Sequence, residues 1–248
     1  MELSALILAL EAIAPPELAE DFDHGKIGLI VPGYEKVTKV ATALDPTPFV
    51  VQRAVDMHAQ AIVVHHTLIW NPLTSINTDL ANVLKPLLEN DISLYAMHTN
   101  YDRAPGGVNE TLADLLDLRD AVSVDLCRAG IVEDQTLKSL AAAASKALKV
   151  EVEMVGKPDR EICTVVTAAG SAFREALPIA RKLEADVLVS SELRHDVIRD
   201  RGDVALISAP HYFTEAPAMK RLAERLSSSK NVSAEFIDDP PEIRVIRG

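Results

Sequence analysis

Histidine and carboxylate side chains follow apolar runs at three separate places in the sequence. These are the usual protein ligands of zinc, iron and manganese. If the apolar runs are strands of an α/β core, their C-terminal ends meet at one edge of a sheet, where binding sites are commonly built. The candidate metal ligands are His65, His66, Asp102, His211 and Glu215.

The vicinal histidines His65 and His66 end the apolar run 61–64, which predicts a short buried strand. Adjacent imidazoles at a strand end can point apart, which suits two metal ions, one for each side chain, better than chelation of one ion. Taken alone, the pair could also be two surface or capping histidines, because histidine is common in loops and at strand ends.

The second place is the segment 98–102, just after the apolar run 92–97. The carboxylate of Asp102 could bridge two cations through its two oxygens. His98 is either a further ligand or a partner that orients one. Asp102 could instead start a turn before the Pro-Gly-Gly sequence at 105–107.

The third place is the start of a predicted helix, where His211 and Glu215 stand four residues apart and therefore share one helix face. An ordinary exposed helix turn would show the same spacing. Taken together, three histidines and two carboxylates exceed the four ligands of a structural zinc. They fit a two-metal site that keeps open positions for water.

Alternating apolar and amphipathic stretches predict an α/β fold whose strands are covered by helices. The predicted strands are 27–31, 37–44, 61–64, 92–97, 150–155, 163–168, 186–189, 204–208 and 232–237. The predicted helices are 1–14, 48–58, 79–89, 108–118, 133–148, 172–184 and 210–226. The least apolar junctions indicate a metal-binding α/β part at 1–120 and 204–248 and a second α/β subdomain at 121–203.

The composition limits the classes of partner and compartment. A formal net charge of −12 makes nucleic acid an unlikely partner, and 48% hydrophobic residues argue against disorder. No stretch is long enough to span a membrane, and the apolar N-terminal segment lacks the basic start of a signal peptide. We therefore expect a cytoplasmic protein, with Cys127 and Cys163 as reduced, buried thiols.

Several segments resemble motifs of the NIF-three-like family, also called the GTP cyclohydrolase I type 2 homologues. The run 98–110, HTNYDRAPGGVNE, is close to the most specific signature of that family. The other matching segments are 16–23, 28–29, 65–70, 190–192 and 211–215. Together the matches extend from about residue 15 to about residue 226, nearly the whole chain.

The resemblance implies a three-layer α/β fold of two related halves, assembled as a toroidal homohexamer with metal pairs facing an internal cavity. It carries the five ligands over to the same five positions and places Glu192 and His195 opposite the metals. From it we expect a metal-dependent hydrolase that uses two iron, zinc or manganese ions, with Glu192 or His195 as general base or acid. A non-enzymatic metal-binding or regulatory ring is the alternative.

One further turn, Ala169-Gly170-Ser171, precedes a predicted helix. Such a turn could hold an anion at the helix N-terminus, or it could be an ordinary connection between a strand and a helix. The sequence shows no phosphate-binding loop of the Walker type, so the substrate is not predicted.

Overall fold

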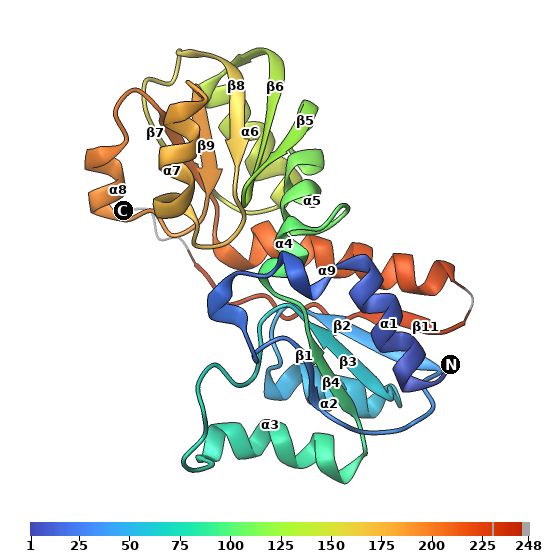
Figure 1. The fold of residues 1–248 in the computed structure, drawn as a ribbon. Coiled ribbons are helices and arrows are strands. Elements are labelled where there is room, and N and C mark those ends of the chain that lie inside the picture. Colours follow the sequence, from blue (N-terminus) through green and yellow to red (C-terminus); the bar gives the residue numbers. More distant parts are fainter. Residues whose placement is uncertain (230, 245–248) are drawn as a thin grey trace. The chain divides into compact units, whose positions relative to one another are not determined.

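The computed structural model describes residues 1–229 and 231–244, which form two compact units, each with its own sheet (Figure 1). The first unit comprises Met1–Ile7, Lys26–Ala96 and the described part of Met219–Gly248, and the second comprises Leu8–Gly25 and Met97–Ala218. The domain boundaries expected from the sequence, after 120 and after 203, stay a prediction. The compact units change over at other positions.

The first unit holds a five-stranded sheet of order β1-β4-β3-β2-β11. Its strands are β1 (Gly28–Val31), β2 (Lys39–Ala43), β3 (Ala61–Val64), β4 (Ser93–Ala96) and β11 (Ser233–Phe236). All pairs are parallel except β1 with β4. The connecting helices are α2 (Pro48–Asp56) and α3 (Thr78–Glu89).

The core of the first unit forms where these helices cover the sheet. Ile62 of β3 and Leu94 of β4 are fully buried in one cluster with Val50 of α2 and Leu87 of α3. Branched apolar side chains on short strands that are buried on both faces favour a parallel sheet. The strands β3 and β4 end shortly before the candidate ligands His65 and His98.

The second unit holds a six-stranded sheet of order β5-β6-β8-β9-β10-β7. Its strands are β5 (Arg119–Val124), β6 (Cys127–Thr136), β7 (Glu153–Val155), β8 (Glu161–Thr167), β9 (Val187–Ser190) and β10 (Ala205–Ser208). The central strands β8, β9 and β10 are parallel, and the others join them antiparallel. The helices that belong wholly to this unit are η1 (Pro16–Leu18), η2 (Asp21–Asp23), α4 (Thr99–Arg103), α5 (Val108–Leu115), α6 (Leu137–Leu148), α7 (Phe173–Lys182) and α8 (His195–Asp200).

The two units repeat one order of elements. With α1 (Leu3–Ile13) as its first helix, the chain runs α1-β1-β2-α2-β3-α3-β4 and later α6-β7-β8-α7-β9-α8-β10. Neighbouring strands match as well, because β1-β4-β3-β2 in one sheet corresponds to β7-β10-β9-β8 in the other. The expectation of an α/β fold with two related halves is therefore confirmed.

Equivalent backbone hydrogen bonds support this correspondence. Gln60 precedes β3, where its N–H donates to Lys39 O and its carbonyl accepts from Ser93 N. Asp186 precedes β9, where its N–H donates to Thr164 O and its carbonyl accepts from Ala205 N. Gln60 and Asp186 thus occupy equivalent positions in the two halves.

The segment 119–136 differs from the expectation. It was expected to be a weakly apolar junction followed by a helix from residue 133, but it forms the hairpin of β5 and β6. Most of β5 is exposed, so its sequence carries no alternation of buried and exposed residues. The helix begins only at Leu137, because the Thr136 side chain caps it. The short helices α4 and α8 were not expected either.

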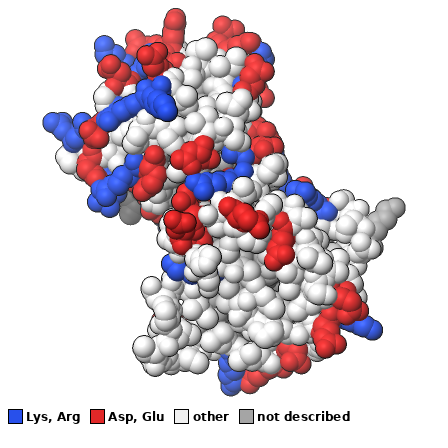
Figure 2. Space-filling model, in the orientation of Figure 1, with Lys and Arg blue, Asp and Glu red and all other residues white. Residues whose placement is uncertain are grey.

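The surface agrees with the acidic composition. On the face drawn in Figure 2, Lys and Arg side chains are interspersed with Asp and Glu and form no continuous basic surface. Within residues 1–229 and 231–244, no helix has the length and apolar character to cross a bilayer.

Candidate metal centre

In the first unit, the candidate ligands His65 and His66 follow the last residue of β3. The N–H groups of both residues donate to Leu44 O, at 3.1 and 3.0 Å, which ends the strand pairing and turns the chain. The two imidazole centroids are 5.0 Å apart and the rings are tilted by 51°. His65 is fully buried and His66 is partly buried, so neither is an ordinary loop histidine at the surface.

His66 has a carboxylate partner within the same unit. Its Nδ1 lies 2.7 Å from Asp45 Oδ1. Asp45 follows β2 and its side chain is partly exposed. This contact orients the His66 ring.

In the second unit, His98 and Asp102 lie on one short helical segment. His98 is the N-cap residue of α4, its N–H donates to Asn100 Oδ1 at 2.9 Å, and its carbonyl accepts from Asp102 N at 3.1 Å. Residues four apart share a helix face, so the two side chains start from the same side of α4. Asp102 is therefore part of a helix, and the alternative that it only starts a turn is not what the structure shows.

The His98 ring contacts the carboxylate of Asp23, the last residue of η2. The Asp23 carboxylate is fully buried, and its two oxygens lie 2.9 and 3.0 Å from His98 Nδ1. Thr99 donates to the same carboxylate from its N–H, at 3.1 Å, and from its hydroxyl. Burial alone would raise the pKa of Asp23, but the hydrogen bonds from His98 and Thr99 together hold this pKa below its usual value.

His211 and Glu215 lie together at the start of α9 (His211–Ser228), which follows β10. His211 Nε2 is 2.9 Å from Glu215 Oε2. The other ring nitrogen of His211, Nδ1, is 3.0 Å from Glu192 Oε1. Glu215 is 4% exposed, so its carboxylate lies in the interior while the His211 ring reaches it from one turn earlier.

Gly170 gives Glu215 its space. A Cβ at position 170 would lie 2.1 Å from Glu215 Oε1 and 3.2 Å from His211 Nε2. The residue also has a φ of +68°, where a side chain is strained, and its N–H donates to the Thr214 hydroxyl at 3.0 Å. The turn at 169–171 thus makes room for a carboxylate, and its use as an anion site stays a prediction.

The two residues proposed as acid or base lie differently. Glu192 has a φ of +60°, in the left-handed region, and its side chain is half exposed. Hydrogen bonds from Ser171 and His211 lower the pKa of the Glu192 carboxyl. His195 is exposed as the first residue of α8. Their roles in proton transfer stay predictions.

Six side chains in the described part of the chain belong to groups of His, Asp and Glu that could hold a metal ion. Five are the ligands expected from the sequence, and the sixth is His98. The six are His65, His66, His98, Asp102, His211 and Glu215. The chain therefore carries plausible metal-binding groups.

Sequence reasoning missed three residues that contact the candidate ligands or make room for them: Asp23, Asp45 and Gly170. Asp23 and Asp45 are separated from their histidines by 75 and 21 residues, so no local spacing reveals the contacts. A glycine just before a predicted helix was the signal at position 170, but an ordinary turn has the same signature.

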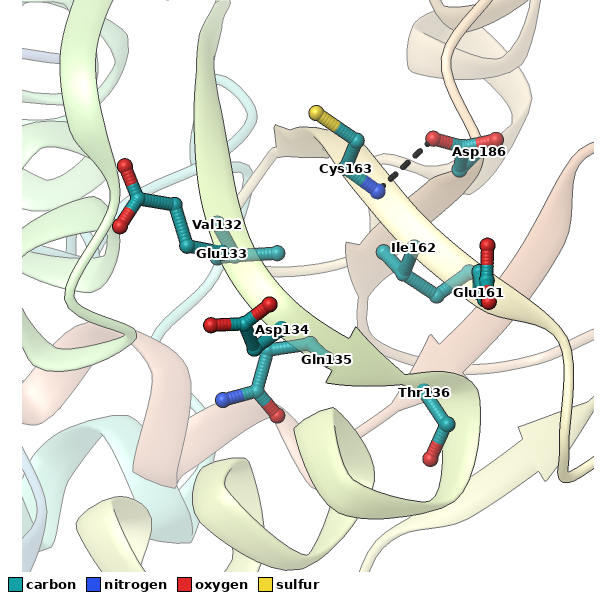
Figure 3. A pocket seen from close by; sticks show the side chains of 9 residues that line it. All are labelled: Val132, Glu133, Asp134, Gln135, Thr136, Glu161, Ile162, Cys163 and Asp186. Carbon is teal, nitrogen blue, oxygen red and sulfur yellow. Dashed lines mark hydrogen bonds between the residues drawn. The ribbon is translucent and has the colours of Figure 1, made fainter.

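A separate pocket of about 730 Å³ lies in the second unit, where β6 bulges away from β8 (Figure 3). It is lined by Val132, Glu133, Asp134, Gln135, Thr136, Glu161, Ile162, Cys163 and Asp186. It contains none of the candidate ligands, so it is not the candidate metal centre.

One expectation about the cysteines was wrong. Cys163 is exposed in the pocket rather than buried, because its strand lies beside the bulge of β6. Cys127 is buried as expected, which raises the pKa of its thiol to about 12. Both thiols are free.

The chain is a duplicated α/β protein that carries histidines and carboxylates at the ends of its strands and the starts of its helices. These side chains are of the types that bind divalent metal ions. Residues 1–241 match the family Duf34/NIF3 (NGG1p interacting factor 3), and the chain belongs to this family.

Curated relatives and solved structures agree with this assignment. A GTP cyclohydrolase 1 type 2 homolog of Clostridium perfringens is 29% identical over 96% of this chain and 95% of its own length. One from Streptomyces coelicolor is 33% identical over 87% of this chain and 82% of its own length.

Among solved structures, protein ybgI, of unknown function, matches with a TM-score of 0.90 and 26% identity, over 98% of this chain and 100% of that chain. Reduced HcgD from Methanocaldococcus jannaschii matches with a TM-score of 0.85 and 27% identity, over 96% and 98% of the two chains.

Proposed function

We propose that this chain holds a pair of divalent metal ions and acts as a metal-dependent hydrolase. The proposed ligands are His65, His66, Asp102, His211 and Glu215. The observation that carries the proposal is the pair on α9, where His211 Nε2 and the buried Glu215 Oε2 are 2.9 Å apart. With metal–ligand bonds of about 2.1 Å, two ligands of one ion are about 3 Å apart when they meet at a right angle.

The residues present fit such ions in two respects. Imidazole nitrogens and carboxylate oxygens suit iron, zinc or manganese, and the ligand set contains no thiolate. Gly170 also lets the Glu215 carboxylate lie beside the His211 ring, because any side chain at position 170 would displace the carboxylate.

When bound, two metal ions would lower the pKa of a bridging water and polarise the bond that is attacked. The residues of the chain would supply the rest. Asp102 would help to hold the ions through its carboxylate. Glu192 or His195 would accept or donate the proton.

Metal analysis of the purified protein tests the first half of the proposal. We expect about two metal ions per chain in the wild type after reconstitution with iron, zinc or manganese, and clearly fewer in Glu215→Gln and Asp102→Asn. Glu224→Gln is the matched control, since Glu224 is an exposed carboxylate on the same helix α9. Less than one ion per chain in the wild type would overturn the proposal.

Turnover tests the second half. The metal-loaded wild type is assayed against GTP, because the relatives bear the GTP cyclohydrolase label, and against phosphoesters and amides. Hydrolysis that disappears in Asp102→Asn supports a hydrolase. Full metal occupancy without turnover of any of these substrates would favour a non-enzymatic metal-binding or regulatory ring.

We also propose that the chain assembles as a homohexamer in the cytoplasm, as the family resemblance implies. Light scattering on the purified protein is expected to give six times the 26.9 kDa mass of one chain. A monomer or dimer at micromolar concentration would contradict this assembly.

A further inference from the structure

Three histidines share one arrangement that the proposed ligand set does not explain. In each, Nδ1 contacts a carboxylate of the same unit: Asp45 at 2.7 Å from His66, Asp23 at 2.9 Å from His98, and Glu192 at 3.0 Å from His211. We call these contacts the three carboxylate–histidine pairs. They come from different segments, so a local sequence preference does not account for them.

The contact decides which ring nitrogen carries the proton. At neutral pH an ionised carboxylate only accepts hydrogen bonds, so the nitrogen that faces it must be protonated. The neutral imidazole then has its lone pair on Nε2. A metal ion that binds such a ring must bind it through Nε2.

The His98 pair is the most tightly built of the three. The Asp23 carboxylate is fully buried, and Thr99 donates its N–H, at 3.1 Å, to the oxygen Oδ2. These contacts hold the carboxylate against His98 Nδ1. His98 also shares the α4 segment with the proposed ligand Asp102.

We propose that the three carboxylates are positioning residues, each of which keeps a proton on Nδ1 of its histidine, so that Nε2 is the nitrogen that binds a metal ion. This inference rests on the proposed metal function. It adds His98 to the ligand set, and it gives Glu192 a role in orienting His211, which leaves His195 as the residue of the two that would transfer the proton.

Asp23→Asn tests the inference sharply. The Thr99 N–H requires an oxygen at the Oδ2 position, so the amide nitrogen of the new side chain falls at Oδ1, 2.9 Å from His98 Nδ1, while the retained oxygen stays 3.0 Å from it. The neutral amide holds the Nδ1 proton more weakly than the carboxylate does, and its N–H₂ group can donate to an unprotonated Nδ1. The Nε2–H tautomer, which lacks the lone pair that would bind the metal, therefore becomes populated. Asp21→Asn, an exposed carboxylate in the same short helix, is the matched control.

Two readouts are needed. Long-range proton–nitrogen NMR of metal-free, ¹⁵N-histidine-labelled protein reports each tautomer, and competition with a chelator reports affinity for zinc. In the wild type and in Asp21→Asn we expect the Nδ1–H pattern for His66 and His98. His211 Nε2 also lies 2.9 Å from the Glu215 carboxylate, so the Nδ1 proton of His211 is read in the zinc-bound protein. In Asp23→Asn, His98 shows the Nε2–H pattern in part of the molecules, and zinc affinity falls about 10- to 100-fold.

A second variant, Glu192→Gln, keeps the test informative if Asp23→Asn fails to fold, because the Glu192 side chain is 55% exposed. Its expected effect is a changed His211 signal and a similar loss of affinity. An Nε2–H pattern for His66 or His98 in the metal-free wild type, or unchanged zinc affinity in both variants, would overturn the inference alone. A wild type that shows the Nδ1–H patterns but binds no metal would overturn the proposed function, and this inference with it.

Discussion

The two halves of the molecule share a backbone frame but present different side chains from it. After β3, the first unit presents His65 and His66 directly from the strand end. After the equivalent strand β9, the second unit presents Ser191 and Glu192, and its candidate ligands sit on helices instead. A repeated frame therefore does not mean a repeated site, because the loops and helix starts can vary while the buried strands stay alike.

A second contrast lies at the opposite ends of the same strands. Gln60, before β3, accepts hydrogen bonds at Oε1 from the N–H groups of Thr38 and Lys39. Asp186, before β9, accepts them at Oδ2 from the N–H groups of Cys163 and Thr164. The same structural task is done by a neutral side chain in one half and by a charged one in the other.

The largest expected effect concerns the shared frame. Ile62→Ala in β3 and Leu188→Ala in β9 remove fully buried side chains at equivalent positions, so each should lower the free energy of unfolding by about 2–5 kcal/mol. Chemical denaturation measures the loss. Ile76→Ala, at a side chain that is 62% exposed, should change the free energy by less than about 0.5 kcal/mol. If Ile62→Ala or Leu188→Ala lowered the free energy of unfolding by less than Ile76→Ala does, the two positions would not be equivalent parts of the core.

The next largest expected effect concerns Gly170 and Glu215 in the second unit. Gly170→Ala would place a methyl group 2.1 Å from Glu215 Oε1, so metal affinity should fall at least about tenfold, which is about 1.4 kcal/mol. Gly202→Ala has a similar φ of +62° but its nearest other atom is 3.9 Å away. Both variants share the cost of about 1–2 kcal/mol for a left-handed side-chain residue. Equal metal affinities in the two variants would show that Gly170 does not serve Glu215.

The smallest effect concerns Gln60 and Asp186. Burial alone would raise the pKa of Asp186, but hydrogen bonds from the Thr164 and Cys163 N–H groups and from Arg160 hold it below 3.8. A lowered pKa in the folded state adds stability that is present above pH 3.8 and is lost as the pH falls below it.

Asp186→Asn should therefore cost about 1 kcal/mol at pH 7 and make unfolding less dependent on acidic pH. Gln60→Ala should instead cost about the same at a pH well below 3.8 as at pH 7, because no charge is involved. Urea denaturation across this range measures both. An unchanged acid dependence in Asp186→Asn would show that this carboxylate does not distinguish the halves.

Prediction from sequence succeeded where local signals were strong. The run 61–64 is apolar and β-branched, and it forms β3 with the predicted bounds. The strand 119–124 escaped prediction because it is an exposed edge whose residues alternate in no consistent way. Its existence depends on pairing with β6, which no local pattern encodes.

By itself, the sequence determined the α/β class, most strands and helices, the acidic surface and the candidate ligands, since residue type and spacing decide these locally. Only the tertiary structure decided which carboxylate stands behind which histidine, and which glycine clears the space before Glu215. The physical reason is that these contacts join segments far apart in the chain. Their geometry follows from how the strands and helices pack and not from the order of neighbouring residues.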